Sequence, residues 1–320
     1  METSEKALTH FLKKGICILL SALALILCLF FAVTGSPDRF QDTYVGALPL
    51  KYETLQRTEG KKIIIIGGSS AAFGIDEALL KAETGYEVVN LGLHAGFGPL
   101  FNTEIAKSGI QAGDIVLLGY EYELSQDAFQ KLGDVNLIME GIDSHLAIYR
   151  SIPLRNFPEI LGNLLHYAMD KLEGPSDTVG TYARDSFDAA GSMILPRKTG
   201  LSDYEDNKDH YGIITEEKLG LTEGNRDYLR NFKAFTEEKG ASVYLIAPPL
   251  LKEACTPDAA ALRQYALDLE KETGIPYLSD PAAYLFPGDW MFDTIYHCND
   301  LGERERTRLL SAELKNLLNP

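Results

Sequence analysis

One stretch, residues 61–76 with the sequence KKIIIIGGSSAAFGID, constrains the fold of this chain more than any other. Four consecutive isoleucines, residues 63–66, are apolar on both faces, which is typical of a strand buried inside a parallel sheet. The run ends at GGSS, residues 67–70, and DEALLKA at 76–82 then has helical character. A sharp strand-to-helix turn places a small hydroxyl group at the carboxyl edge of the sheet, where ligands and nucleophiles commonly lie. Ser69 is therefore a candidate nucleophile, although a tight turn with a serine helix cap explains the residues equally well.

Short apolar segments alternate with helical segments through most of the remaining chain. This alternation indicates βαβ units and a parallel sheet of about five strands, which makes the fold α/β. The expected strands are 62–66, 87–91, 114–118, 241–247 and 275–279, and the expected helices are 76–83, 100–108, 223–239, 258–272 and 303–318.

The alternation lapses between residues 125 and 221. The first part of this segment has helical periodicity, and residues 173–211 are rich in Gly, Ser, Asp and Pro. We expect a helical and loop insertion over the sheet edge that forms a lid or a substrate platform. A disordered linker is the alternative, which the aromatic residues Tyr182, Phe187, Tyr204 and Tyr211 disfavour. Residues 184–191, RDSFDAAG, are candidates to line the cleft from this insertion.

The N-terminal segment predicts a membrane anchor. Residues 15–34 contain no charged side chain, and twenty helical residues span about 30 Å, the thickness of a bilayer core. Lys13 and Lys14 directly before this run favour a cytoplasmic N-terminus and an extracytoplasmic C-terminal domain. A cleaved signal peptide is the alternative. We therefore expect a cytoplasmic tip and transmembrane anchor at 1–35, a juxtamembrane linker at 36–60 and an α/β domain at 61–320.

Composition excludes some classes of partner. The net charge of -16 disfavours a nucleic-acid partner, because no basic stripe is present to neutralise phosphates. No cysteine spacing suggests a zinc site. Cys17 and Cys28 lie in the apolar segment, and the sequence leaves open whether Cys255 and Cys298 pair.

The last informative stretch is DWMFDTIYHCNDLG, residues 289–302. It places Asp293 and His297 just before the terminal helix. A serine hydroxyl becomes an effective nucleophile when an imidazole accepts its proton, and the imidazole must be oriented by a carboxylate or carbonyl. Together with Ser69, these residues supply the parts of an acyl-transfer site. A structural histidine near a helix start is the alternative.

These motifs, in this order, resemble those of the SGNH/GDSL hydrolases: GGSS after the first strand, NLGLHAG after the second, LGYEYE after the third and a terminal Asp and His. The sequence is more narrowly similar to the membrane-anchored branch that includes teichoic-acid D-alanyl-transfer proteins and alginate O-acetyltransferases. The resemblance covers residues 61–123 and 240–318, and it implies a flavodoxin-like three-layer sandwich and no cofactor or metal.

The resemblance assigns roles residue by residue. Ser69 takes the role of the nucleophile, with Ser70 as its rival, and Gly68 replaces the aspartate that precedes the serine in the family. Gly96 takes the role of the backbone oxyanion donor, with Gly92 as the weaker choice. Glu121 stands where the family has an oxyanion-hole asparagine, so it is an expected oxyanion or substrate-binding residue.

Two departures from the family pattern affect these roles. A carboxylate such as Glu121 can donate a hydrogen bond to an oxyanion only while it is protonated. Three residues separate Asp293 from His297 where the family has two, so Thr294 stands at the expected Asp position. Asp293 still reaches His297 if the segment forms a helical turn, since residues four apart share a face. Asp289 or a backbone carbonyl is the alternative.

The implied activity is that of a serine esterase or O-acyltransferase on a cell-envelope glycan or acyl carrier, with His297 as the general base and Asp293 orienting it. The implied partners are envelope polysaccharide or a carrier substrate, and a membrane acyltransferase. The alternative is a catalytically silent protein of the same fold, which binds envelope polymer or scaffolds an acyl-transfer partner.

Overall fold

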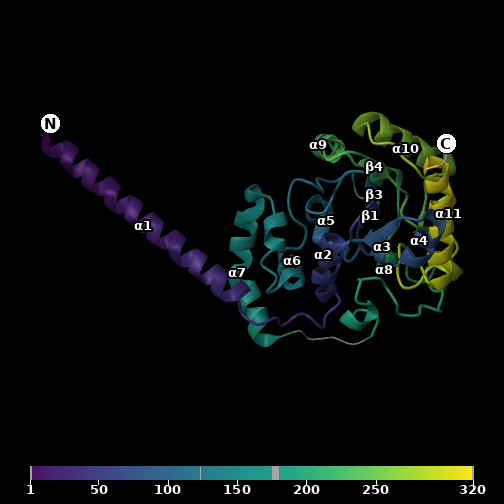
Figure 1. Cartoon of the computed structure of the whole chain (residues 1–320), viewed down its shortest axis with the longest axis horizontal. Coiled ribbons are helices and arrows are strands. Elements are labelled where there is room, and N and C mark those ends of the chain that lie inside the picture. The colour runs from purple at the N-terminus through teal and green to yellow at the C-terminus, as the bar shows by residue number, and fades with distance from the viewer. Residues whose placement is uncertain (1, 123, 175–179, 319–320) are drawn as a thin grey trace.

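The computed structural model describes residues 2–122, 124–174 and 180–318, and places one long helix outside a compact α/β domain (Figure 1). The helices are α1 (Glu2–Thr34), α2 (Leu48–Arg57), α3 (Ser69–Ala72), α4 (Glu77–Thr84), α5 (Gly98–Lys107), α6 (Val135–Ile142), α7 (Phe157–Glu173), α8 (Lys208–Tyr211), α9 (Glu223–Glu238), α10 (Ala259–Thr273) and α11 (Asp300–Leu318). The strands are β1 (Lys62–Gly67), β2 (Glu87–Asn90), β3 (Ile115–Gly119), β4 (Ser242–Leu245), β5 (Leu250–Leu251) and β6 (Leu285–Phe286).

The central sheet is parallel and has the order β2-β1-β3-β4. This is the flavodoxin-like order for the first four strands, so the predicted α/β fold class is confirmed. The predicted fifth strand at 275–279 lies beside β4 as expected, but it makes only a single bridge, between Tyr277 and Leu245. The sheet therefore has four strands rather than five, and β5 and β6 form a separate two-stranded parallel pair.

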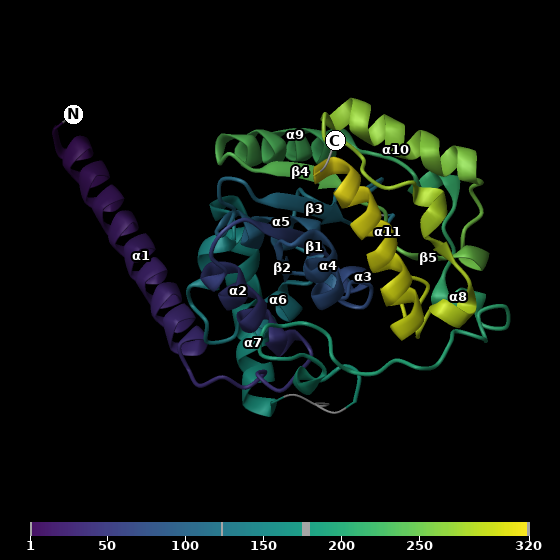
Figure 2. The ribbon, with the colours of Figure 1, turned by 45° about the vertical axis from the view of Figure 1, so that its right-hand side comes forward.

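Alternate residues of the buried strands pack into two cores. Ile63 and Ile65 of β1 pack with α4 and α11, whereas Ile64 and Ile66 pack into the larger core that includes α5. Figure 2 shows α4 and α11 on one side of the sheet. The isoleucine run is apolar on both faces because both faces of its strand are covered.

The C-terminal helix α11 is tied to the turn after β1 by a fully buried arginine. Arg306 donates from Nη1 to the Ser70 carbonyl at 2.6 Å and from Nη2 to the Ala247 carbonyl at 3.3 Å. Residues more than 200 positions apart are thus fixed at the carboxyl edge of the sheet. That edge includes the topological switch point, because β2 lies on one side of β1 and β3, the next strand in the chain, lies on the other.

The opposite, amino edge of the sheet carries a sealed ion pair. Lys62 and Asp114 lie 3.0 Å apart with both side chains fully buried. Asp114 also accepts backbone hydrogen bonds from Lys62, at 3.1 Å, and from Gln111, at 2.8 Å. The pair therefore holds the starts of β1 and β3 together.

Residues 36–60, expected as a juxtamembrane linker, are part of the folded domain. They contain α2, in which Lys51 and Leu55 are buried. Lys51 donates to the carbonyls of Asn90 and Gly191 at 3.0 and 2.6 Å. The mixed composition of this segment predicted a linker, but it is explained by a short helix, α2, that has one buried face.

The junction between α1 and the domain is held by Asp143, which ends α6 with a positive φ of 41°. Asp143 accepts hydrogen bonds from the backbone N–H groups of Arg39 and Phe40, at 2.6 and 3.1 Å, and pairs with Lys171 at 2.5 Å. Lys171 in turn donates to the carbonyls of Val33 and Ser36, both at 3.2 Å. The chain leaving α1 is therefore fixed against α6 and α7.

Candidate active site

Ser69 is the first residue of α3, directly after β1 and Gly68. Its side chain is largely buried and lines a cavity of about 390 Å³ at the carboxyl edge of the sheet. A Cβ on Gly68 would lie 3.0 Å from the Ala95 Cα, so a glycine here lets the loop after β2 pack tightly against the turn. Ser70, the rival nucleophile, is fully buried and does not line this cavity.

His297 lines the same cavity as Ser69, on the segment just before α11. Its imidazole stacks on the Phe73 ring, with centroids 4.2 Å apart and planes 4° apart. Phe73 directly follows α3, and its backbone N–H donates to the Ser69 carbonyl at 2.9 Å. The turn that carries Ser69 therefore also carries the ring that supports His297.

Asp293 orients the imidazole. Its Oδ1 lies 2.8 Å from His297 Nδ1. A carboxylate accepts, so Nδ1 carries the proton and Nε2 is the basic nitrogen. The turn is stabilised by Thr294, whose hydroxyl accepts from the backbone of Tyr296 and His297 at 3.2 and 3.1 Å. The longer spacing thus still lets a carboxylate reach the histidine, and Asp293 rather than Asp289 makes the contact.

Tyr182, in the insertion, joins this pair. Only an aromatic side chain in a loop marks it in the sequence, and no motif indicates its role. Its hydroxyl donates to Asp293 Oδ2 at 2.6 Å and lies 3.3 Å from His297 Nδ1. Burial raises the pKa of Asp293, but the hydrogen bond from His297, the charge of His297 and the hydrogen bond from Tyr182 outweigh it, so the pKa lies below its usual value. The carboxyl is therefore ionised at neutral pH.

Gly96 does not reach the site as expected. Its N–H donates to His94 Nδ1 at 2.9 Å, within the turn after β2, and Gly96 is not among the residues lining the Ser69 cavity. The N–H of Gly92 donates to the Asn90 side chain at 2.9 Å. Both candidate glycine donors are thus already paired within the chain. The His94 side chain accepts the Gly96 N–H, and the spacing of residues in the sequence does not predict this hydrogen bond.

Glu121 lies just after β3 and lines the cavity with Ser69 and His297. Its Oε1 is buried and finds no hydrogen-bond partner among the described residues. Burial raises the pKa of this carboxyl, against the opposing effects of the His297 charge, Ser70 and Arg306. A carboxyl that keeps its proton can act as a hydrogen-bond donor, as the missing asparagine would.

The insertion forms one wall of the cavity, through residues 211–214 and Lys218. Residues 184–191 do not line it; Arg184 instead donates to the Phe187 carbonyl at 2.9 Å. Within the parts of the chain that the structure describes, no cluster of side chains could hold a metal ion. Cys255 and Cys298 are both free, and burial raises the pKa of the Cys298 thiol to about 12.

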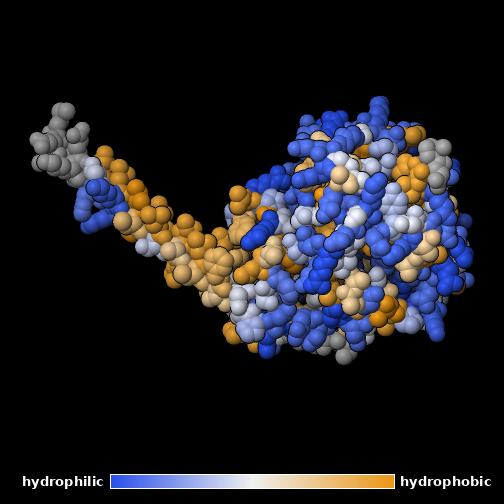
Figure 3. All heavy atoms as spheres, viewed as in Figure 1, coloured by the Kyte–Doolittle hydropathy of each residue, from blue (hydrophilic) through white to orange (hydrophobic). Residues whose placement is uncertain are grey.

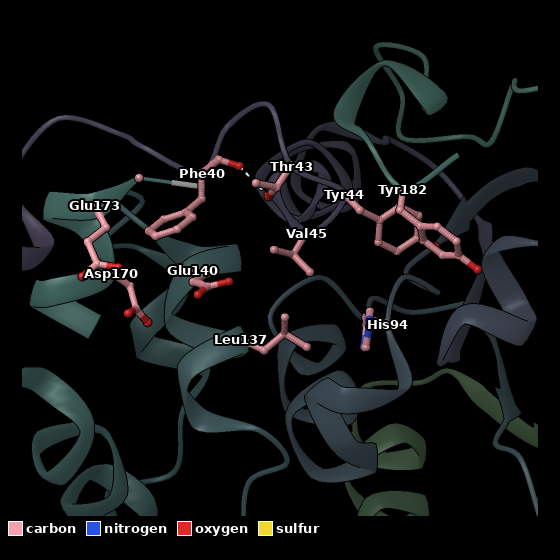
Figure 4. A pocket seen from close by; sticks show the side chains of 11 residues that line it. Phe40, Thr43, Tyr44, Val45, His94, Leu137, Glu140, Asp170, Glu173 and Tyr182 are labelled. Atoms are coloured by element: carbon pink, nitrogen blue, oxygen red, sulfur yellow. Dashed lines mark hydrogen bonds between the residues drawn. The ribbon is translucent and has the colours of Figure 1, made fainter. Parts of the chain in front are cut away.

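A second cavity of about 510 Å³ has Tyr182 in its lining (Figure 4). Tyr44, His94 and Tyr182 line one end of it, and the carboxylates Glu140 and Asp170 line the other. Burial and the charges of Asp170 and Asp134 raise the pKa of Glu140 to about 7. Tyr182, which donates to Asp293, thus also lines this acidic cavity.

Comparisons with known proteins add little to this geometry. No protein-family model matches the sequence, and no curated protein matches it. Among solved structures, the chain is similar to the crystal structure of the protein YxiM from Bacillus subtilis, with 15% sequence identity and a TM-score of 0.39. The match covers 82% of this chain and 58% of that one, so this chain spans little more than half of its length. A similarity of this size says nothing about activity.

Proposed function

We propose that this chain is a membrane-anchored serine esterase or O-acyltransferase of the SGNH type. Ser69 would attack an acyl carbonyl, His297 Nε2 would accept the hydroxyl proton, and Asp293 would hold the imidazole and stabilise the imidazolium. The observation that carries the proposal is that Ser69 and His297 line one cavity, with Phe73 linking the Ser69 turn to the imidazole.

The reaction is an acyl transfer in two steps. Attack by Ser69 Oγ forms an ester with the acyl group, and the proton taken by His297 goes to the leaving alcohol. Water or a second alcohol then attacks the acyl-enzyme and regenerates Ser69. Esterase and transferase differ only in that second nucleophile. Glu121, as a neutral acid, and the Ser69 N–H are the proposed oxyanion donors in place of Gly96.

The membrane part of the proposal rests on α1. Residues 8–34 form the only described helix that is long and apolar enough to cross a membrane, and almost none of its apolar surface is buried in the protein. We propose that α1 is a single-pass anchor and that the domain lies on the extracytoplasmic side, since Lys13 and Lys14 precede the span. The envelope glycan or acyl carrier as substrate follows from that location and from the sequence resemblance.

The test is active-site labelling of the purified full chain with a fluorophosphonate. We expect the native protein to react and Ser69→Ala to show no labelling. His297→Ala should react far more slowly because the base is lost. Ser70→Ala is the matched control for the loss of a serine hydroxyl, and it should still be labelled because the Ser70 side chain does not line the cavity. Labelling of Ser69→Ala at the native rate would contradict the proposal.

A second candidate function is a catalytically silent binding protein. The observation that favours it is that the N–H groups of Gly92 and Gly96 are both bonded within the chain. An absence of labelling in the native protein, together with binding of envelope polysaccharide that Glu121→Ala abolishes, would favour this function over the enzyme.

A further inference from the structure

Helix α7 has a buried inward face and an apolar outward stripe. Its inward face is buried in the domain and consists of Ile160, Leu164, Tyr167 and Lys171. Its outward stripe has the same spacing, of four and three residues, and contains no polar side chain: Pro158, Gly162, Leu165, Met169 and Leu172. Leu165, Met169 and Leu172 are 68%, 60% and 82% exposed. Since a helix on the surface of a water-soluble domain carries polar residues outward, this stripe requires another covering.

The stripe continues the lipid-facing surface of α1. Phe30, in the last turns of α1, packs against Phe157 at the start of α7, with ring centroids 5.9 Å apart. A hollow between the two helices is lined by Val33 of α1 and by Ala168 and Leu172 of α7. Leu172 thus belongs both to the stripe and to the junction with α1. Figure 3 shows the hydrophobic surface of α1 continuing onto the edge of the domain where the two meet.

We propose that α7 lies in the surface of the bilayer that α1 spans, with its outward stripe in contact with the acyl chains. The inference rests on α1 being a membrane anchor, as proposed above, and not on the chemistry of Ser69. Continuity with α1 selects lipid as the occupant over a second protein, because α1 itself presents almost no surface that protein covers. At seventeen residues, about 25 Å, α7 is too short to cross a bilayer easily and suits an in-plane position.

The polarity around the stripe agrees with this position. His166 and Glu173 lie together on one flank of the stripe and are exposed and polar, so they would lie at the level of the headgroups. The chain carries a net charge of -16, so attraction to anionic lipid does not drive the contact. Burial of the stripe should therefore proceed on neutral phosphatidylcholine and should be insensitive to salt.

The experiment uses quenching of tryptophan by lipids brominated on their acyl chains. The full chain is reconstituted in phosphatidylcholine nanodiscs in a Trp290→Phe background, which leaves no native tryptophan. Single tryptophans are then placed by Met169→Trp in the stripe and by Leu20→Trp in the span. The matched control is Leu267→Trp, a leucine that is 61% exposed on α10, and this helix lies on the side of the domain away from α1. All three positions are exposed, so the substitutions should not disturb the fold.

We expect a strong loss of fluorescence at positions 20 and 169 and none at 267. Quenching at 20 without quenching at 169 would overturn the inference while leaving the anchor intact. In that case a blue-shifted emission at 169 would identify a protein, not lipid, as the covering. An unquenched signal at position 20 would remove the anchor and the inference together. Equal quenching at 169 and 267 would show contact that is not specific to α7 and would also overturn it.

Discussion

The two ends of the central sheet each hold a carboxylate paired with a basic side chain, but their surroundings differ. At the amino end, Lys62 and Asp114 are completely buried, and the backbone saturates the carboxylate. At the carboxyl end, the Asp293 side chain is 31% exposed and His297 lines the cavity that Ser69 also lines. A sealed pair can only hold structure, whereas a pair with a basic nitrogen open to a cavity can exchange a proton with a ligand.

The largest effect on the open pair should come from Asp293→Asn. The amide keeps the shape of the side chain but cannot hold the imidazole with its proton on Nδ1, so we expect kcat to fall by about ten-thousandfold. The measurement is hydrolysis of a short-chain activated ester. The thermal midpoint should change little, because Asp293 is partly exposed. Near-native activity would show that Asp293 and His297 have only a structural role, like Lys62 and Asp114 at the amino end of the sheet.

At the sealed pair, Lys62→Met should act on stability and not on chemistry. It leaves Asp114 as an unpaired buried charge, which typically costs about 3–5 kcal/mol of unfolding free energy. Denaturant titration measures the loss. The double variant Lys62→Met with Asp114→Asn removes both charges and should recover part of it. A single variant no less stable than the double one would contradict the assignment.

Glu121 gives a prediction on pH dependence. Because burial raises the pKa of Glu121, its proton is retained above the usual range of a glutamate, and activity should fall when the pH passes that raised pKa. Glu121→Gln keeps a donor and should lose the alkaline fall. Glu121→Ala removes the donor and should cost about a hundredfold or more in kcat. The groups that act on this titration are His297, Ser70 and Arg306.

If the activity of Glu121→Gln falls at alkaline pH as that of the native protein does, a group other than Glu121 causes the fall. Loss of activity in both variants to the same extent would point to a role of the carboxylate form instead.

The smallest effect should come from Tyr182→Phe, which keeps the ring and removes one donor to Asp293. Loss of a hydrogen bond to a charged group should reduce kcat by about tenfold. The pKa of Asp293 should rise, since this hydrogen bond helps to lower it, and an NMR titration of this carboxyl measures the rise. An unchanged pKa of Asp293 would show that Tyr182 only fills space.

The sequence was sufficient to predict the strands of the sheet because their residues carry the signal themselves. The isoleucines of β1 are apolar on both faces, and the glycines and serines after them mark the turn. The weak point was the fifth strand: Pro276 and the chain around it allow only one bridge to β4.

The site was predictable where partners are close in the chain or, as for Ser69 and His297, where motif order places residues at the same edge of the sheet. Asp293 and His297 are four residues apart, so their contact could be expected. Phe73 and Tyr182 approach His297 across the fold, and no local pattern marks them. The Gly96 N–H donates to the side chain of His94. That hydrogen bond depends on the His94 rotamer, which the spacing of residues does not predict.

The fixed junction around Asp143 has a consequence for which molecules the cavity can receive. The chain after α1 is bonded to α6 and α7, so the domain is not joined to α1 by a loose tether. With α1 as the membrane anchor proposed above, this junction would hold the mouth of the cavity at one height above the lipid, and a substrate of the proposed reaction would have to present its ester at that height.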